Sequence, residues 1–170
     1  MKAKGLLLLG LLFSGAFLQA QTNTGCKCCE TAFRQFDFWV GDWVTTAAGK
    51  PAGTNRIVIL QDSCVIQENW VSAASNYTGT SYNFYDPVAG KWRQTWIDNQ
   101  GGNLLLEGGM ENGNMVMYSG ELKNREGKPY INRITWTPNP DGSVRQLWEV
   151  SNDNGKNWNA VFDGLYKQKE

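Results

Sequence analysis

Apolar and polar residues alternate along most of the chain from Trp43 onward, in short segments separated by turn-forming residues. This two-residue period is typical of β-strands, in which successive side chains point to opposite faces of a sheet. A preceding segment, residues 30–38, suits a short helix with Thr31 as its cap. We expect ten strands, at residues 43–46, 54–61, 64–73, 78–85, 91–98, 103–108, 114–122, 130–137, 143–151 and 158–167.

The turns between these strands are short and supply Gly or Asn where a positive φ is needed, as in Asn112-Gly113. Strands joined in this way are antiparallel neighbours, because parallel pairing needs a crossover of about a dozen residues or more. Sequential antiparallel strands curl and close, which removes their exposed edges. We therefore predict an all-β fold, a single antiparallel up-and-down β-barrel of about 8–10 strands with a short N-terminal helix. A two-sheet sandwich is the alternative, although the lack of long Greek-key connections counts against it.

Four strands carry a Trp two residues after another side chain that points to the same face: Glu68/Trp70, Gln94/Trp96, Ile134/Trp136 and Gln146/Trp148. A face with large aromatic rings beside polar groups suits a lined cavity better than a dry core. If this face points inward, Glu68 becomes a buried carboxylate, and burial should raise its pKa unless an Arg pairs with it. The candidate ligand-binding residues are Glu68, Trp70, Tyr82, Gln94, Trp96, Trp136, Gln146 and Trp148.

Two other arrangements stay open. In the first, the four Trp fill an ordinary core, and the polar residues beside them lie near the mouth of the barrel. In the second, the opposite face points inward and brings Arg93, Arg133 and Arg145 inside, which would suit an anionic ligand. Four residues extend the inner surface if their strands keep the register of the Trp pairs: Tyr82, Phe84, Met115 and Met117.

The segment Ser151–Trp158 matches the Asp-box pattern Ser-x-Asp-x-Gly-x-x-Trp of sialidase-like propellers. In those folds the box stabilises a hairpin, with its Asp bonding turn amides and its Trp packing beneath. A propeller would repeat the box in each blade, and here it occurs once. We therefore interpret Asp153 and Trp158 as structural residues.

Residues 1–20 carry two Lys, an apolar run over residues 6–13, and small residues up to Ala20, which is the pattern of a secretory signal peptide. The apolar run is too short for a membrane span, and no later segment approaches the required length. We expect a signal peptide at 1–20, a Cys-containing N-terminal segment at 21–35 and a barrel domain at 36–170. The mature protein is expected to be exported, to the periplasm or the extracellular medium.

The composition excludes several function classes. Residues 21–170 hold 14 basic and 16 acidic residues, a formal charge of −2, and the basic residues are scattered singly. A nucleic-acid binder would carry a basic stripe instead. The chain has no His, which excludes Ser-His-Asp and Cys-His catalysis, His-ligated haem and most catalytic zinc sites. We expect no cofactor and no metal.

The four Cys are Cys26, Cys28, Cys29 and Cys64. In an exported protein, disulfide bonding is the first interpretation, and a bond from Cys64 to one of the other three would tie the N-terminal segment to the barrel wall. A soft-metal site made from Cys-x-Cys-Cys is a second interpretation. Lipid attachment at Cys26 is a third, although an apolar residue does not precede it at the usual position.

Gly41-x-Trp43, after a short apolar helix and at the start of the first strand, resembles the corresponding motif of lipocalin-like, or calycin, barrels. A longer pattern is similar to an uncharacterised family of exported bacterial proteins, and it covers most of the mature chain. This resemblance implies a lipocalin-like barrel and carries no catalytic residues to transfer. The pattern consists of Phe36-Asp37-Phe38-Trp39-x-Gly41-x-Trp43, Tyr85-Asp86-Pro87, Trp92-Arg93-Gln94-Thr95-Trp96 and Phe162-Asp163-Gly164-x-Tyr166.

Together these features favour a barrel that binds a small apolar or amphipathic molecule between aromatic walls, with Glu68, Gln94 and Gln146 orienting it by hydrogen bonds. One alternative is an isomerase, cyclase or hydrolase that uses Glu68 or Asp98 as acid or base in the same cavity. A glycan-binding module would instead place aromatic rings on one outer face. An interaction module would have a filled barrel and a large apolar outer patch.

Overall fold

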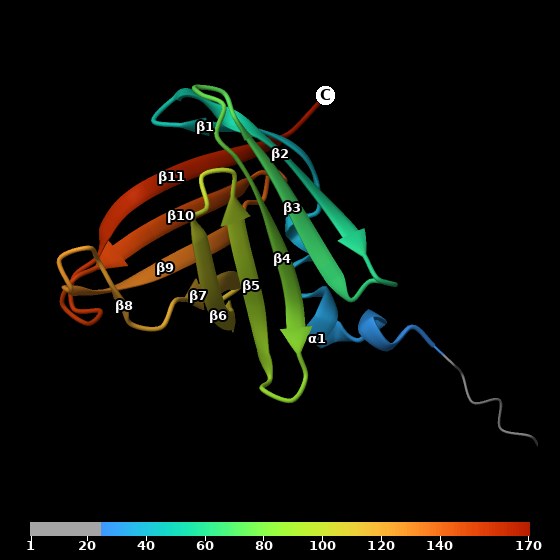
Figure 1. The fold of residues 1–170 in the computed structure, drawn as a ribbon. Helices are drawn as coiled ribbons and strands as arrows, with labels where there is room; N and C mark the ends of the chain where they lie inside the picture. The colour runs from blue at the N-terminus through green and yellow to red at the C-terminus, as the bar shows by residue number, and fades with distance from the viewer. Residues whose placement is uncertain (1–24) are drawn as a thin grey trace, which may run out of the picture.

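The computed structural model describes residues 25–170, so the expected signal peptide at 1–20 lies outside the described residues. Ten strands form one closed antiparallel barrel, in which each strand pairs with the next one along the chain and β11 pairs with β1 to close the barrel. The strands are β1 Gly41–Ala47, β2 Lys50–Leu60, β3 Val65–Ser72, β4 Thr78–Asp86, β5 Lys91–Asp98, β6 Asn103–Glu111, β7 Asn114–Tyr118, β9 Pro129–Pro138, β10 Val144–Ser151 and β11 Asn159–Gln168 (Figure 1). The predicted all-β barrel is confirmed.

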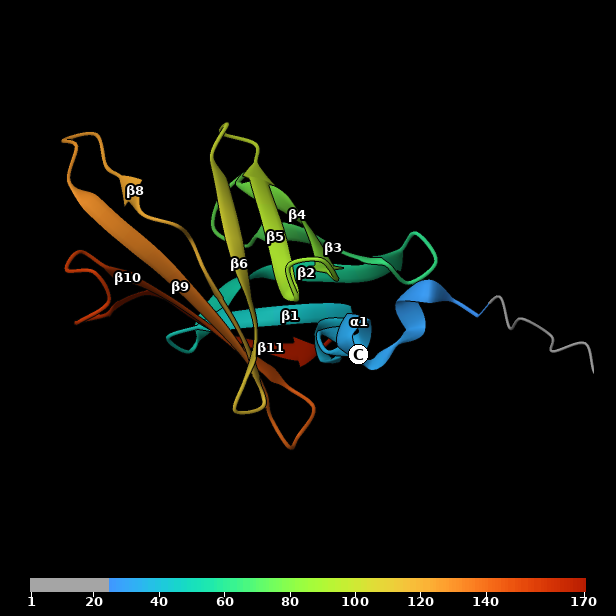
Figure 2. The ribbon, with the colours of Figure 1, turned by 90° about the horizontal axis from the view of Figure 1, so that it is seen from below.

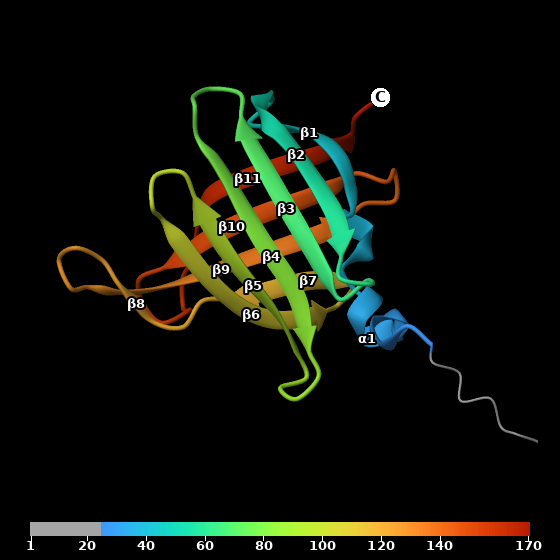
Figure 3. The same ribbon diagram turned by 45° about the vertical axis from the view of Figure 1, so that its right-hand side comes forward.

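The barrel wall is strongly curved. In Figure 3, strands β2 to β5 cross in front of β9 to β11, which form the far wall. The expected strand at 114–122 is divided, because the chain leaves the β7 ladder after Tyr118 and forms the two-residue strand β8, Leu122–Lys123. β8 pairs with the start of β9 only, so it extends the sheet outside the closed barrel.

The N-terminal segment covers one end of the barrel, which we call the closed end. It contains the 3₁₀ turn Lys27–Cys29, the helix α1 Thr31–Arg34 and a second 3₁₀ turn Asp37–Trp39. Figure 2 shows α1 beside the ends of β1 and β11. The helix is shorter than the expected 30–38, and the expectation for Thr31 is wrong, because Glu30 occupies the N-cap position without a side-chain bond.

Two disulfides hold this segment. Cys28 is bonded to Cys64 in the β2–β3 turn, which is one of the pairings expected from the sequence. Cys26 is bonded to Cys29. Arg34 also donates to the Ser63 carbonyl of that turn at 3.0 Å. All four thiols are therefore used in covalent bonds, which leaves no thiolate for the soft-metal site considered from the sequence.

Aromatic rings fill the closed end. Phe36 and Trp39 come from the N-terminal segment and stack with ring centroids 5.0 Å apart. Both contact Trp136 of β9, at 5.1 and 5.4 Å between centroids. These rings are fully buried, together with Trp43, Trp92, Met115 and Met117. Burying a large apolar side chain contributes about 1.5–3 kcal/mol relative to leaving it exposed, so this closed-end core is a main source of stability.

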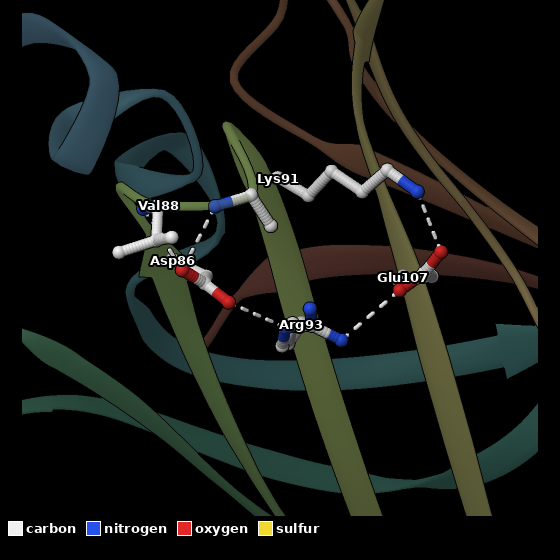
Figure 4. A network of polar contacts seen from close by, with 6 residues as sticks. Asp86, Val88, Lys91, Arg93 and Glu107 are labelled. Atoms are coloured by element: carbon white, nitrogen blue, oxygen red, sulfur yellow. Dashed lines mark hydrogen bonds and ion pairs between the residues drawn. The ribbon is translucent and has the colours of Figure 1, made fainter.

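The strand register places the Trp pairs on the inner face and the Arg residues outside. Arg93 bonds Asp86 at 2.9 Å and Glu107 at 3.0 Å on the outer surface of β4 to β6 (Figure 4). The other two Arg are also ion-paired, Arg133 with Glu149 and Arg145 with Asp163. The arrangement with these Arg residues inside is therefore wrong.

The Asp-box segment forms the β10–β11 hairpin, as its structural interpretation predicted. Asp153 accepts hydrogen bonds from the Asn157 amide at 2.9 Å and from the Ser151 hydroxyl at 2.8 Å. These bonds lower the pKa of Asp153 to about 2, and the bonds from Asn157 contribute most. Trp158 lies against Arg133 of β9, with the guanidinium 4.1 Å from the ring centroid. This motif therefore anchors a turn on the outside of the barrel.

Candidate functional site

A cavity of about 360 Å³ lies inside the barrel above the closed-end core, toward the end where β3 finishes and β4 begins. We call it the Glu68 cavity. Six of the eight predicted ligand-binding residues line it, from strands β3, β5 and β10. The lining consists of Ala52, Glu68, Trp70, Ser72, Tyr77, Gln94, Trp96, Leu104, Ile134, Gln146, Trp148, Val161, Phe162 and Tyr166.

Trp136 does not line the cavity, although it belongs to the same sequence pattern as the other three Trp. Strands β3, β5 and β10 run toward the cavity mouth, so the Trp of each pair lies nearer the mouth than its polar partner. Strand β9 runs the other way, which places Ile134 in the cavity wall and Trp136 in the closed-end core. Trp136 is therefore a core residue.

Tyr82 also lies outside the cavity, so the expectation that it extends the inner surface is wrong. The side chain is 42% exposed on the outer face of β4, where Gln67 donates to its hydroxyl at 3.2 Å. Phe84 is exposed on the same face. The inward positions of β4 are held by Gly79, Ser81 and Asn83 instead. Met115 and Met117 do point inward, into the closed-end core.

Glycines on the inner face make room for the aromatic walls. A Cβ on Gly79 would lie 2.1 Å from the Trp96 ring, and a Cβ on Gly164 would lie 2.5 Å from the Phe162 ring. A Cβ on Gly53 would lie 2.6 Å from Trp70. The Trp70 and Trp96 rings therefore lie against the backbone of the adjacent strand, and the Phe162 ring lies against the backbone of its own strand. This arrangement keeps the rings against the wall and leaves the centre of the barrel open.

Glu68 is the central polar residue of the cavity. It is 5% exposed, and its two carboxylate oxygens accept hydrogen bonds from the Asn55 amide and the Ser81 hydroxyl, each at 2.7 Å. Neither partner carries a charge. Burial therefore dominates and raises the pKa of Glu68 from 4.5 to about 7, although the two hydrogen bonds oppose this effect. The pKa rise expected from the sequence is confirmed.

The hydrogen bonds of Glu68 continue across the floor of the cavity. The Asn83 side-chain amide donates to the Ser81 hydroxyl at 3.0 Å, and the Gln94 side-chain amide donates to the side-chain oxygen of Asn83 at 2.7 Å. These residues come from adjacent strands, and their register places them side by side. The chain of bonds fixes the rotamers of Gln94 and Glu68 before any ligand arrives, which is the preorganisation that a binding site needs.

The opposite wall carries a second polar group. The Tyr166 hydroxyl donates to the side-chain oxygen of Gln146. Burial raises the pKa of Tyr166 well above its usual value, and the nearby negative charge of Glu68 raises it further. Tyr166 therefore stays neutral, and it holds the Gln146 amide beside the cavity.

Trp148 is also held in place by a hydrogen bond to a residue that does not line the cavity. Its indole N–H donates to the Asn132 side-chain oxygen at 2.8 Å. The Asn132 amide in turn donates to the Ser119 hydroxyl at 3.4 Å. The ring is thus oriented by β9 and by the segment after β7, although its face borders the cavity.

Asp98, the other candidate acid or base, is the last residue of β5 and is not among the residues that line the cavity. Its Oδ1 accepts hydrogen bonds from the amides of Gln100 and Gly102 at 2.9 and 2.8 Å. These bonds lower the pKa of Asp98. Its Oδ2 accepts a bond from the Tyr77 hydroxyl at 3.1 Å, so its role here is to hold a cavity residue at the mouth.

Several lining or supporting residues were not identified from the sequence: Asn55, Tyr77, Ser81, Phe162 and Tyr166. Phe162 and Tyr166 alternate with Gly164 in a strand facing β10, a pattern that could have placed them on the Trp face. Tyr77 comes just before β4, so the alternation of side chains along a strand does not predict its direction. Asn55 and Ser81 become significant only because the register brings them opposite Glu68.

The outer wall also has a larger depression, of about 660 Å³, along β6 and the residues that follow β7. Three of its four charged groups already pair, since Lys91 bonds Glu107 at 2.6 Å and Arg93 bonds the other oxygen of the same carboxylate (Figure 4), and the fourth, Glu111, is exposed. No unpaired buried group points into it among the described residues. The Glu68 cavity is therefore the stronger candidate.

A scan against protein-family models finds no match for the chain, and a search of curated proteins finds none either. Within residues 25–170, no helix has the length and apolar character needed to cross a membrane. The same part of the chain holds no cluster of three or more His, Cys, Asp or Glu placed to bind a metal ion. The chemistry of the site must therefore be argued from its own side chains.

Proposed function

We propose that this protein is an exported, lipocalin-like barrel that binds a small, partly apolar molecule in the Glu68 cavity. The observation that carries the proposal is an open interior lined by Trp70, Trp96 and Trp148 around one fixed carboxylate. Its volume of about 360 Å³ is at the lower end of the range for ligand pockets, about 300–1,000 Å³. A compact ligand is therefore favoured. The two disulfides support export, since such bonds persist in oxidising compartments.

The polar groups of the cavity are suited to orient a ligand. The amide of Gln94 and the carboxylate of Glu68 are held by neighbouring side chains, and Gln146 is held by Tyr166. A ligand would meet these groups without first reordering them, so less conformational entropy is lost on binding. The paired Trp residues all lie inside the barrel, which argues against glycan binding on an outer face.

A neutral fluorescent hydrophobe, N-phenyl-1-naphthylamine, tests the proposal. We expect saturable one-to-one binding with quenching of Trp emission, and affinity at least fivefold weaker in Trp96→Ala. Trp158→Ala is the matched control, because Trp158 lies on the outer hairpin; its affinity should stay within about twofold of wild type. Equal loss in both variants, or no saturable binding to wild type, would contradict the proposal.

Acid–base catalysis is the second candidate function, and the chemistry of Glu68 favours it. A carboxyl with a pKa of about 7 is poised to accept or release a proton near neutral pH. The reaction class would be proton transfer at carbon next to a carbonyl, with Glu68 taking the proton. Deuterium exchange into phenylacetone, followed by NMR, tests this: exchange should exceed the buffer rate and disappear in Glu68→Gln. Exchange at the buffer rate would contradict a catalytic role for Glu68.

A further inference from the structure

The charged groups in and beside the cavity are all negative. Among its fourteen lining residues, Glu68 is the only charged side chain, and no Lys or Arg is present. The four Arg residues of the barrel strands, Arg56, Arg93, Arg133 and Arg145, lie on the outer face, and each is paired with a carboxylate. A second carboxylate, Asp98, is bonded to Tyr77 at the mouth. The interior thus presents negative charge without a matching cation from the described residues.

Aromatic rings line the walls of the same cavity. Trp70 lies near Phe162 and Tyr166, with centroid distances of 6.3 and 6.4 Å, and Tyr77 lies 6.5 Å from Trp96. The negative faces of such rings attract a cation, most strongly for Trp, and the attraction grows when water is excluded. A buried carboxylate with several aromatic faces around it is the chemistry that recognises organic ammonium ions.

Glu68 also has unused hydrogen-bonding capacity. Each carboxylate oxygen accepts one hydrogen bond from the protein, from Asn55 or from Ser81, whereas an ionised carboxylate offers about four lone-pair sites. Both donors are neutral, so they fix the position of the carboxylate but leave its charge uncompensated. A bound cation would supply that compensation, as buried charges require.

From this geometry we propose that the Glu68 cavity selects a compact organic ammonium ion, whose charge pairs with Glu68 while its apolar part packs on Trp70, Trp96 and Trp148. This inference rests on the proposed function and specifies the ligand class for the same cavity. It also predicts pH dependence, because a cation binds the ionised form of Glu68. The uncharged groups around Glu68 in the cavity are Asn55, Ser81, Gln94 and Gln146, and the titratable ones are Tyr77 and Tyr166, whose pKa values burial raises above the ordinary 10.

Two probes of equal shape test the inference, phenyltrimethylammonium and tert-butylbenzene, with benzenesulfonate as the anionic comparison. Binding to the purified, disulfide-bonded chain is measured by Trp emission and calorimetry. We expect phenyltrimethylammonium to bind at least tenfold more weakly to Glu68→Gln than to wild type, while tert-butylbenzene changes less than about twofold. Glu107→Gln, which removes an outer carboxylate, should leave both affinities unchanged.

Wild-type protein supplies a second readout that needs no substitution. Phenyltrimethylammonium keeps its charge at every pH, so its affinity should fall at least tenfold between about pH 8 and about pH 5.5 as Glu68 is protonated. Tert-butylbenzene should show no such fall.

The outcomes separate the two proposals. Binding of tert-butylbenzene without phenyltrimethylammonium, tighter binding of benzenesulfonate, or cation affinity that ignores both pH and Glu68→Gln would overturn the ammonium inference and leave the binding barrel standing. If none of the three probes binds and N-phenyl-1-naphthylamine also fails, both proposals fall.

Discussion

The two ends of this barrel use the same residue types for opposite purposes. At the closed end, Phe36, Trp39 and Trp136 interlock and exclude space. At the open end, Trp70, Trp96 and Trp148 lie along the wall and border an open interior. The difference comes from their surroundings: the closed end receives an inserted N-terminal segment, whereas the open end has Gly where further side chains would fill the space. An aromatic residue thus becomes core or cavity wall according to what faces it.

The largest expected effect comes from truncating one Trp at each end. Trp136→Ala should lower the free energy of unfolding by about 3–5 kcal/mol, because it leaves a void in a tightly packed core. Trp96→Ala should cost only about 1–2 kcal/mol, because its ring already borders open space. Urea unfolding followed by circular dichroism measures both values. Similar losses in the two variants would mean that the open end is packed like the closed end.

The next effect concerns the charge that only the open end carries. The pKa of Glu68 is raised in the folded state, so protonation favours folding. This stabilising contribution is fully present below about pH 4.5 and is lost as pH rises through about 7. Its size is on the order of 3 kcal/mol. Carboxylates with a lowered pKa, such as Asp153, act in the opposite sense and lose their contribution only at more acidic pH.

This pH effect is isolated by comparing wild type with Glu68→Gln. Between about pH 5 and about pH 8, wild type should lose stability relative to the variant, because Gln does not titrate. Glu107→Gln provides the control, since its carboxylate lies on the outer surface between Lys91 and Arg93. A constant difference between wild type and Glu68→Gln across this range would show that Glu68 keeps an ordinary pKa.

The smallest effect comes from adding one methyl group at each end. In Gly108→Ala the new Cβ would lie 2.0 Å from the Val116 carbonyl oxygen, a backbone atom that moves little, so a loss of about 2–3 kcal/mol is expected. In Gly79→Ala the Cβ meets the Trp96 ring instead, and that ring can swing into the cavity. Its stability should change by about 1 kcal/mol or less.

Gly79→Ala should, however, weaken N-phenyl-1-naphthylamine binding by at least threefold, because the displaced ring occupies ligand space. Gly108→Ala that remains folded should bind the probe normally, since Gly108 is not part of the cavity lining. The reverse pattern, with binding lost at Gly108 and kept at Gly79, would contradict the location of the site.

The fold could be predicted from local patterns, because alternation and short turns determine both the strands and their antiparallel order. The depth of each Trp was also predictable from the strand count, since Trp136 falls on a strand of opposite direction to those of Trp70 and Trp96. The spacing of Glu68 to Trp70 predicted that the two side chains share one face, and a raised pKa was predicted for the case in which that face points inward.

Other features depend on contacts that no local pattern contains. In β4 the aromatic residues Tyr82 and Phe84 favour an inward orientation by hydrophobicity, yet they face outward. The inward positions go to Gly79 and Ser81 because Trp96 needs space and Glu68 needs a donor. These requirements come from neighbouring strands. The choice of Cys28 as the partner of Cys64 likewise depends on how the N-terminal turn lies on the barrel.

The pairing of all four cysteines has a practical consequence for measurement. Because the chain has no free thiol, a single new cysteine would be its one site of thiol labelling. Val161 is a suitable position, since it is 55% exposed and also borders the cavity. An environment-sensitive dye attached to Val161→Cys would report occupancy through its emission, which turns the protein into a sensor with which candidate ligands are screened.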